Sequence, residues 1–391
     1  MPVPELTNLN IENVYVYVAD AVRWDSLPAE LRARGLTIKT IAASIHSPAS
    51  FASIVTGSYP PTHGVTDFES QLPETLRTLF DCDGYNTDFV NTLGPADGHD
   101  PIYSVLNQAP DDRSDPFKNV SEPFILMERA QGGHAPYGQH GGTAAEYFET
   151  HRNAPIDTLR DSYQKGIRSD AEQFRDRLET LEENGWLSDT LVIYTSDHGE
   201  LLGEGGMFGH NGPIRPELVY VPTVFVHPRL PAQEVEVPFG HTDILSTVAE
   251  SLNVFEEVSP EHHDNRTNRR YSFYETEFQL PGFGPQTMRY KSVWNDDGGA
   301  VLTETPRWIR AIGVLDDLLD SQQRFLTRRR AFIFNLLNSY RARRQQFGSP
   351  EFKFNTKTDL ETVYTALNTS VEDSVELSEE ACNRLHDLGY K

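Results

Sequence analysis

The chain of 391 residues predicts an α/β fold, with a large, mostly parallel central sheet that carries helices on both faces and a smaller C-terminal α+β subdomain. Three observations support this fold class. Segment 13–19 is apolar at almost every position, which is typical of a central strand buried on both faces. Apolar side chains recur at three- and four-residue spacing over 159–181, as in an amphipathic helix. A second apolar strand follows at 190–196.

The other elements of the main sheet region follow from cap and breaker residues. They are a short helix that begins at Ser47 and can end at Gly57, a helix over about 161–183 stopped by Asn184-Gly185, a strand over 219–227, and a helix from Asp243, as its cap, through Leu252.

A polar stretch over 255–275 predicts a boundary, so we expect a first domain over 1–265 and a smaller subdomain over 266–391. The subdomain is expected to contain strands at 270–277 and 289–294, one or two helices over 314–346, and a last helix capped by Ser378 that presents Ala381, Leu385 and Leu388.

The composition is acidic, with 58 Asp and Glu against 34 Lys and Arg and a formal net charge of −24. Only seven of the basic residues are Lys. An acidic, lysine-poor chain is typical of adaptation to high salt, where counterions screen self-repulsion. An ordinary acidic protein is the alternative. In either case an acidic surface disfavours nucleic acid as a partner.

The sequence also bears on the compartment. The first apolar run, 14–18, is short and is followed at once by a candidate site residue, so we expect neither a signal peptide nor a membrane span. The two cysteines, Cys82 and Cys382, give no disulfide framework. We therefore expect a cytoplasmic protein without a membrane partner. The oligomeric state stays open.

Residues 324–344 stand out from this acidic background, because they contain seven Arg and no acid. Two interpretations remain open. The segment can form a helix face that pairs with the acidic first domain, or a docking surface for an anionic polymer or partner.

The chemistry-bearing residues lie at the ends of predicted strands and at one helix start. Asp20 follows the first strand, and Asp197 and His198 follow the strand at 190–196. Strand carboxyl ends are where ligands bind in open α/β sheets, and carboxylates with one imidazole suit a divalent cation. Ser47 stands at a helix N-terminus, which favours an incoming anion. The alternatives are that Ser47 and Asp20 are only helix caps.

The motif around Ser47 resembles the sulfatase branch of the alkaline phosphatase superfamily. That family carries a Cys or Ser nucleophile ten residues before a Gly-x-Tyr-Pro-x-x-His-Gly string, and here Ser47 precedes Gly57 to Gly64 at this distance. The chain looks like a halophilic archaeal member of the family. Further matches in the same order are His134 to Tyr137, Ser196 to Glu200, Gly209-His210, Val221-Pro222, His241 to Asp243, Tyr290-Lys291 and Leu388 to Tyr390.

The resemblance implies an alkaline phosphatase-like fold, a catalytic first domain and an ester hydrolase in which Ser47 is a metal-bound nucleophile. It implies Asp20, Ser47, Asp197 and His198 as ligands of one divalent metal ion, Ca²⁺ or else Mn²⁺ or Zn²⁺. His134 and His210 would assist the leaving group, and Lys291, contributed by the subdomain, would meet the ester oxyanion. Arg23 with Asp25, and His63, would support these residues from behind.

The chain also departs from the family pattern. Ala49 and Phe51 stand where the family has the Pro and Arg of the formylglycine motif, and Ala21 replaces a second acid after Asp20. We therefore expect no formylglycine, and an unmodified serine points toward phosphate esters or group transfer rather than sulfate hydrolysis. The expected substrate is an anionic small-molecule or glycan ester. Transfer of a phosphoryl or sulfuryl group to a glycan or alcohol, and a metal-binding pseudoenzyme that recognises an anionic sugar, are the alternatives.

Overall fold

The computed structural model describes residues 3–388, apart from 8, 94–99, 139–140, 255–268, 281–283, 320–329, 351–355, 368–372 and 375–376. Three sequence predictions lie wholly or partly outside these residues. They are the domain boundary at 265/266, the motif residues after Leu388, and the first part of the Arg-rich segment 324–344.

A seven-stranded sheet forms the centre of the molecule, in the order β10-β2-β9-β6-β1-β5-β4. The strand β1 (Asn13–Ala19) runs parallel to both of its neighbours, and β9 alone is antiparallel to the strands beside it. The mostly parallel sheet is thereby confirmed. The other bounds are β2 (Leu36–Ile41), β4 (Asn86–Asn91), β5 (Phe124–Ala130), β6 (Thr190–Ser196), β9 (Tyr220–Val226) and β10 (Gln233–Gly240).

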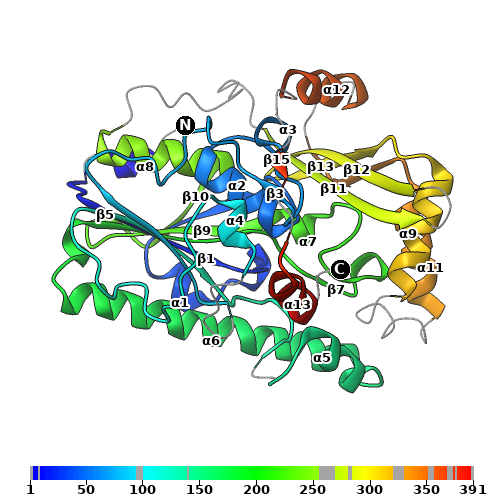
Figure 1. The fold of residues 1–391 in the computed structure, drawn as a ribbon, viewed down its shortest axis with the longest axis horizontal. Coiled ribbons are helices and arrows are strands. Elements are labelled where there is room, and N and C mark those ends of the chain that lie inside the picture. The colour runs from blue at the N-terminus through cyan, green and yellow to red at the C-terminus, as the bar shows by residue number, and fades with distance from the viewer. Residues whose placement is uncertain are drawn as a thin grey trace.

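Helices cover both faces of this sheet (Figure 1). Successive side chains of a strand point to opposite faces, so Val14, Val16 and Val18 of β1 join one core cluster with α2 (Ser47–Thr56) and α8 (Ile244–Leu252). Tyr15 and Tyr17 join a second cluster with the long helix α6 (Ile156–Glu183). All seven residues of β1 are buried, as a strand between two helical layers requires.

The helix predictions hold with two corrections. Helix α6 begins five residues before the predicted start, because Pro155 precedes its first turn and Pro is tolerated there. Helix α8 follows Asp243 as expected, but the side chain does not cap it. The carboxylate of Asp243 instead accepts hydrogen bonds from the backbone of Gly240 and the guanidinium of Arg270.

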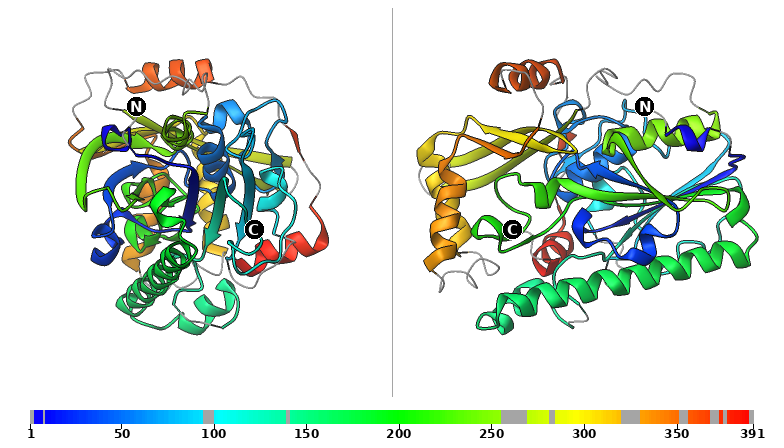
Figure 2. Two further views of the ribbon diagram at one scale, coloured as in Figure 1. Left: turned by 90° about the vertical axis from the view of Figure 1, so that its left-hand side faces the viewer. Right: turned by 180° about the vertical axis from the view of Figure 1, so that it is seen from behind.

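A four-stranded antiparallel sheet with flanking helices forms one end of the molecule, in yellow and orange in Figures 1 and 2. Its strands are β11 (Arg270–Leu280), β12 (Gly284–Asn295), β13 (Gly298–Thr303) and β14 (Arg344–Gly348), and its helices are α9 (Arg307–Leu319), α11 (Arg330–Arg341) and α12 (Thr356–Leu367). The prediction of helix through residue 346 was wrong, because β14 pairs with β13 from residue 344 onward.

The last helix, α13 (Glu379–Leu388), is confirmed with its cap, since the Ser378 hydroxyl accepts the backbone N–H of Ala381. Among the described residues, no helix has the length and apolar character needed to cross a bilayer. The remaining short elements are η1 (Pro4–Leu6), η2 (Trp24–Ser26), α1 (Ala29–Arg32), α3 (Pro60–His63), β3 (Ser70–Gln71), α4 (Ile102–Val105), α5 (Ala144–His151), η3 (Leu187–Asp189), β7 (Leu201–Leu202), η4 (Glu204–Gly206), β8 (Phe208–Gly209), α7 (Pro216–Val219), η5 (His241–Asp243) and β15 (Asp373–Ser374).

Candidate active site

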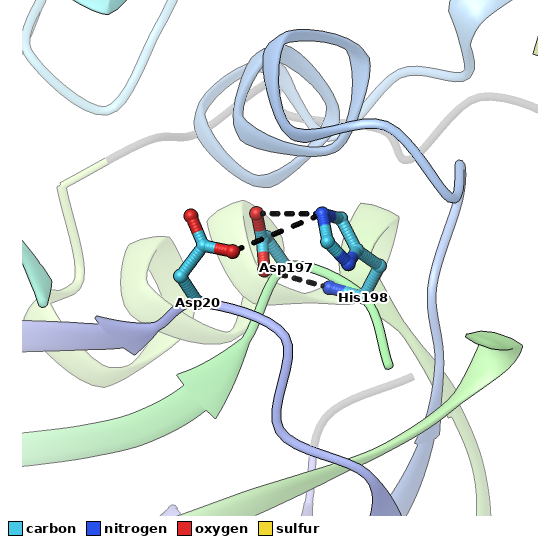
Figure 3. Close-up of side chains that lie close together, drawn as sticks. All are labelled: Asp20, Asp197 and His198. Atoms are coloured by element: carbon cyan, nitrogen blue, oxygen red, sulfur yellow. Dashed lines mark hydrogen bonds and ion pairs between the residues drawn. The ribbon is translucent and has the colours of Figure 1, made fainter. Parts of the chain in front are cut away.

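Two adjacent strands and one helix bring the predicted site residues together. Ala19 of β1 pairs with Ser196 of β6, so Asp20 and Asp197 leave the sheet side by side. Figure 3 shows the two carboxylates and the imidazole of His198 turned toward one another. Ser47, the first residue of α2, completes the group. All four residues are fully buried.

The distances within this group suit a shared ligand. His198 Nε2 lies 3.1 Å from Ser47 Oγ, 3.4 Å from Asp197 Oδ2 and 4.0 Å from Asp20 Oδ1. One ligand atom from each of Asp20, Asp197 and His198 falls within 4.8 Å of the others. The cluster is compact enough for all three side chains to reach one cation.

Backbone contacts fix which atoms face the centre of this group. His198 Nδ1 lies 2.9 Å from the carbonyl oxygen of Gly199, so Nδ1 carries the proton and Nε2 keeps its lone pair. Asp197 Oδ1 accepts the backbone N–H groups of Ala21 and His198, at 3.1 and 2.8 Å. Asp197 therefore turns its other oxygen, Oδ2, toward His198 Nε2.

The donor set fits a divalent cation. Asp20 Oδ1 and Asp197 Oδ2 are buried and, within the described part of the chain, accept no hydrogen bond. Leaving such oxygens without a partner is costly, and a bound cation would satisfy both. Two carboxylate oxygens with one imidazole nitrogen and one hydroxyl suit Mn²⁺ or Zn²⁺, and the oxygen ligands alone also suit Ca²⁺.

Arg129, at the end of β5, is a site residue that sequence analysis missed. Its guanidinium donates from Nε and Nη2 to Asp20 Oδ2, at 3.2 and 2.8 Å, and lies 3.5 Å from Asp100 Oδ1. It also lies 5.6 Å from the ring centre of Phe51. A buried arginine from another strand thus stands beside the position where the family motif has its own arginine. The signal in the sequence was a charged pair, Glu128-Arg129, that interrupts an apolar strand.

The same contacts set the charge of the two acids. Burial acts to raise the pKa of Asp20, but His134 and the Arg129 guanidinium reverse this and hold the pKa below its usual value. Burial and the neighbouring charge of Asp20 raise the pKa of Asp197. A positive charge placed between the two would lower the pKa of Asp197 as well, because it favours the charged form of both carboxyl groups.

The loop after β5 packs directly on Asp20. Gly133 donates its backbone N–H to the Asp20 carbonyl at 2.7 Å, and Gly132 donates to Asp170 Oδ1 on α6 at 3.0 Å. A Cβ atom at Gly132, where φ is +53°, would lie 2.0 Å from the Asp20 carbonyl oxygen. Only glycine fits at this position, and the fit places His134 next to the carboxylate cluster.

His134 and His210 lie beside His198. The ring of His210 is centred 4.2 Å from that of His198 and 5.6 Å from that of His134. Burial lowers the pKa of both His134 and His210. Glu200, which was not predicted as a site residue, lies 3.8 Å from His210 Nδ1, and burial raises its pKa well above the usual range.

Lys291 does not join this group. It alternates along β12 with Tyr290, which packs into the cluster formed with Met207, so its side chain points to the opposite face. There its ammonium lies 3.9 Å from the ring centre of Tyr364 on α12 and 3.9 Å from Glu304. No contact of the described residues links Lys291 to Ser47, and the role of Lys291 at the ester oxyanion stays a prediction.

The three supporting residues differ in their placement. Arg23 pairs with Asp25 through two hydrogen bonds, at 2.9 and 2.6 Å, as expected, and also reaches Glu204. His63 donates from Nε2 to the Ser53 hydroxyl of α2 at 2.9 Å, because its Nδ1 accepts the backbone N–H of Val65. Burial lowers the pKa of His63 to about 3.

Comparison with known proteins agrees with this geometry. A low-salt glycan biosynthesis sulfotransferase, Agl7, of Haloferax volcanii is 30% identical over 97% of this chain and 96% of its own length. A solved 2-O GAG sulfatase superposes with a TM-score of 0.62 at 13% identity, covering 93% of this chain and 95% of its own. The phosphonate monoester hydrolase of Agrobacterium radiobacter superposes with a TM-score of 0.56 at 15% identity, covering 94% and 98%. These two structures share the fold. The sulfatase family model matches residues 25–254, and the chain belongs to the sulfatase family, with the fold of the alkaline phosphatase superfamily.

Proposed function

We propose that this chain is a metal-dependent enzyme that moves a sulfuryl or phosphoryl group from an ester donor to an alcohol through Ser47. The observation that carries the proposal is the buried cluster of Ser47, Asp20, Asp197 and His198 at the N-terminus of α2. The relative named as a glycan biosynthesis sulfotransferase matches nearly the whole chain, which favours a glycan as acceptor and sulfate as the group.

Hydrolysis of a sulfate or phosphate ester, with water as the acceptor, is the second candidate. The sulfatase family model and the sulfatase structures favour it. Both candidates use the same first half-reaction and the same residues. They differ only in which oxygen takes the group from Ser47.

The residues proposed to hold the cation are Asp20, Asp197 and His198. A divalent cation bound there would lower the pKa of the Ser47 hydroxyl and neutralise charge on the group being transferred. The imidazole ligand favours Mn²⁺ or Zn²⁺ over Ca²⁺. Arg129 donates to the Oδ2 atom of Asp20, so that Oδ1 is the oxygen that would be left for a cation.

The chain's own residues account for the bond changes. A bond forms between Ser47 Oγ and the sulfur or phosphorus atom while the bond to the donor oxygen breaks, and the proton lost by Ser47 ends on the departing oxygen. We assign His134 and His210 to the leaving oxygen, because an imidazole that carries a proton on the nitrogen facing that oxygen can donate it there. In the second half-reaction the acceptor hydroxyl attacks the same atom, and Ser47 regains its proton.

The test uses 4-nitrophenyl sulfate and 4-nitrophenyl phosphate with Mn²⁺, in molar KCl, with and without glycerol as a simple alcohol acceptor. We expect 4-nitrophenol release from one donor, a glycerol ester among the products, and loss of both with Ser47→Ala. The control is Ser53→Ala, on the same buried helix but hydrogen-bonded to the helix backbone and His63. Equal rates for Ser47→Ala and the parent protein would refute the proposal, and hydrolysis without a glycerol ester would favour the second candidate.

Peptide mass spectrometry gives a separate check on the nucleophile. We expect Ser47 to be unmodified in the resting protein and to gain one sulfuryl or phosphoryl group when the reaction is quenched. Conversion of Ser47 to formylglycine would contradict the proposed serine chemistry.

A further inference from the structure

A cavity lies next to the nucleophile helix but outside the cluster of Ser47, Asp20, Asp197 and His198. Its volume is about 400 Å³, within the range of small-molecule sites. Ser44 and Ala49, which bracket Ser47 in sequence, form one side, and β11 and β12 of the small sheet form the opposite side. Helix α3 contacts β11 in the same region, and Figure 1 shows the helices α2 and α3 beside the small sheet.

The walls of this cavity combine aromatic rings with hydrogen-bond acceptors. Phe273 and Tyr364 supply rings whose centres lie 5.8 Å apart, and Tyr274, on the other face of β11, supplies a third. Thr276 and Thr287 supply hydroxyl groups. A sugar ring offers C–H groups to aromatic faces and hydroxyl groups to polar side chains. The lining therefore suits a ligand with an apolar ring face and many hydroxyls.

The charges of the lining are mainly negative. Among the described residues that line the cavity, Arg289 is the only cation, and its guanidinium forms two hydrogen bonds to Glu275, which neutralises it. Glu69 and Glu277 also line the cavity and are exposed to solvent. Carboxylates accept hydrogen bonds from hydroxyl groups but repel sulfate and phosphate, and removing an anion from water beside them is costly. The cavity thus favours an uncharged sugar over a charged ester.

One residue connects this cavity with the reactive cluster. His46 immediately precedes Ser47, and its ring packs edge-on against Tyr274 at 6.3 Å and against Phe68 at 5.6 Å. Its Nδ1 atom lies 3.0 Å from the carbonyl oxygen of Thr66, another residue of the cavity wall. His46 is therefore bonded to Ser47 through the backbone and contacts the cavity wall through its ring.

We propose that this cavity is the acceptor subsite, and that it takes an uncharged sugar whose hydroxyl receives the group carried by Ser47. The inference rests on the proposed function, and it assigns the acceptor class. The acceptor oxygen forms a bond to sulfur or phosphorus, the bond to Ser47 Oγ breaks, and the hydroxyl proton returns to Ser47. The acceptor is uncharged when it binds and leaves as an anion, so the acidic lining also promotes product release.

Saturation-transfer NMR tests binding without any chemistry. The probes are methyl α-glucoside, methyl α-mannoside and methyl β-galactoside, each beside its 6-sulfate, with the full chain in molar KCl. We expect at least one uncharged sugar to bind, and to bind more tightly than its sulfate. Thr276→Trp fills the cavity and is expected to weaken binding about tenfold or more. Glu250→Lys, on the exposed side of α8, is the control and leaves binding unchanged.

A second variant keeps the test decisive if Thr276→Trp does not fold. Glu277 is exposed at the cavity, so Glu277→Lys is expected to fold and to shift the preference toward the sulfated sugar several-fold. Absence of binding by all three sugars, tighter binding of the sulfates by the parent protein, or an unchanged preference in Glu277→Lys would overturn the proposal. Because Ser47→Ala is expected to bind the sugar normally, failure of the acceptor subsite and failure of the Ser47 chemistry are separate results.

Discussion

Replacing Gly132 by alanine tests how the loop after β5 fixes the candidate site. Gly132 has φ of +53°, and a Cβ atom there would lie 2.0 Å from the carbonyl oxygen and 2.5 Å from the backbone nitrogen of Asp20. Both neighbours are backbone atoms, so they cannot swing away as a flexible side chain would. The loop must lift from Asp20, which breaks the hydrogen bond from Gly133 N to the Asp20 carbonyl.

Three contributions add up to the loss of stability expected for Gly132→Ala. An alanine at positive φ costs about 1–2 kcal/mol, forced overpacking about 1–3 kcal/mol, and the lost hydrogen bond about 1 kcal/mol. Gly132→Ala should therefore destabilise the protein by about 3–6 kcal/mol. At about 2.1 cal/mol/K of unfolding entropy per residue, this lowers the Tm by roughly 4–7 °C for the whole chain.

Gly185→Ala is the matched control. Gly185 ends α6 at φ of +78° with nothing within 4 Å of the added Cβ, so only the backbone strain of about 1–2 kcal/mol applies. Urea unfolding and Mn²⁺ calorimetry should separate the two variants, since only Gly132→Ala displaces Asp20 and weakens metal binding. Equal stability losses with unchanged metal affinity in both variants would refute the packing argument.

Three further predictions concern charge. Arg129→Met should lower the free energy of unfolding in urea by about 3–5 kcal/mol, because it leaves the buried Asp20 carboxylate without its partner. The control, Arg32→Met at an exposed ion pair, should lower it by less than about 1 kcal/mol. Similar losses of stability in the two variants would contradict this prediction. Burial raises the pKa of Asp170 to about 6, so the folded state binds the Asp170 carboxyl proton more tightly than the unfolded chain does. This carboxyl group therefore lowers the stability of the fold as the pH rises from about 4 to 6. Asp170→Asn should therefore gain stability relative to the parent by roughly 3 kcal/mol between pH 4 and pH 7, and parallel pH curves would exclude it. The Tm should rise with KCl up to molar concentrations, because screening relieves the net charge of −24, and a flat salt dependence would count against adaptation to high salt.

The strand positions could be predicted because their cause is local. Strands β1 and β6 have the predicted bounds, since a strand buried on both faces needs a continuous apolar run and ends where that run ends. The start of α2 at Ser47 and its end at Gly57 likewise follow from residue type, with Gly57 at φ of +66°.

The site was predictable where sequence neighbours share one strand end, and not where partners come from distant strands. Asp197 and His198 adjoin in the sequence, and the pairing of β1 with β6 brings Asp20 to them. Arg129 meets Asp20 only because β5 is the other neighbour of β1, and nothing in the sequence specifies strand order. The contact of Lys291 with Tyr364 could not be predicted for the same reason, since the face to which a strand residue points depends on what packs against the sheet.

The central claim is that Asp20, Asp197 and His198 hold one divalent cation beside Ser47. Anomalous diffraction from crystals grown with Mn²⁺ tests it most directly. We predict one strong anomalous peak within about 2.6 Å of Asp20 Oδ1, Asp197 Oδ2 and His198 Nε2, with the Ser47 hydroxyl as a further ligand. A crystal at full Mn²⁺ loading with no peak at this cluster, or with a peak held by other residues, would contradict the account.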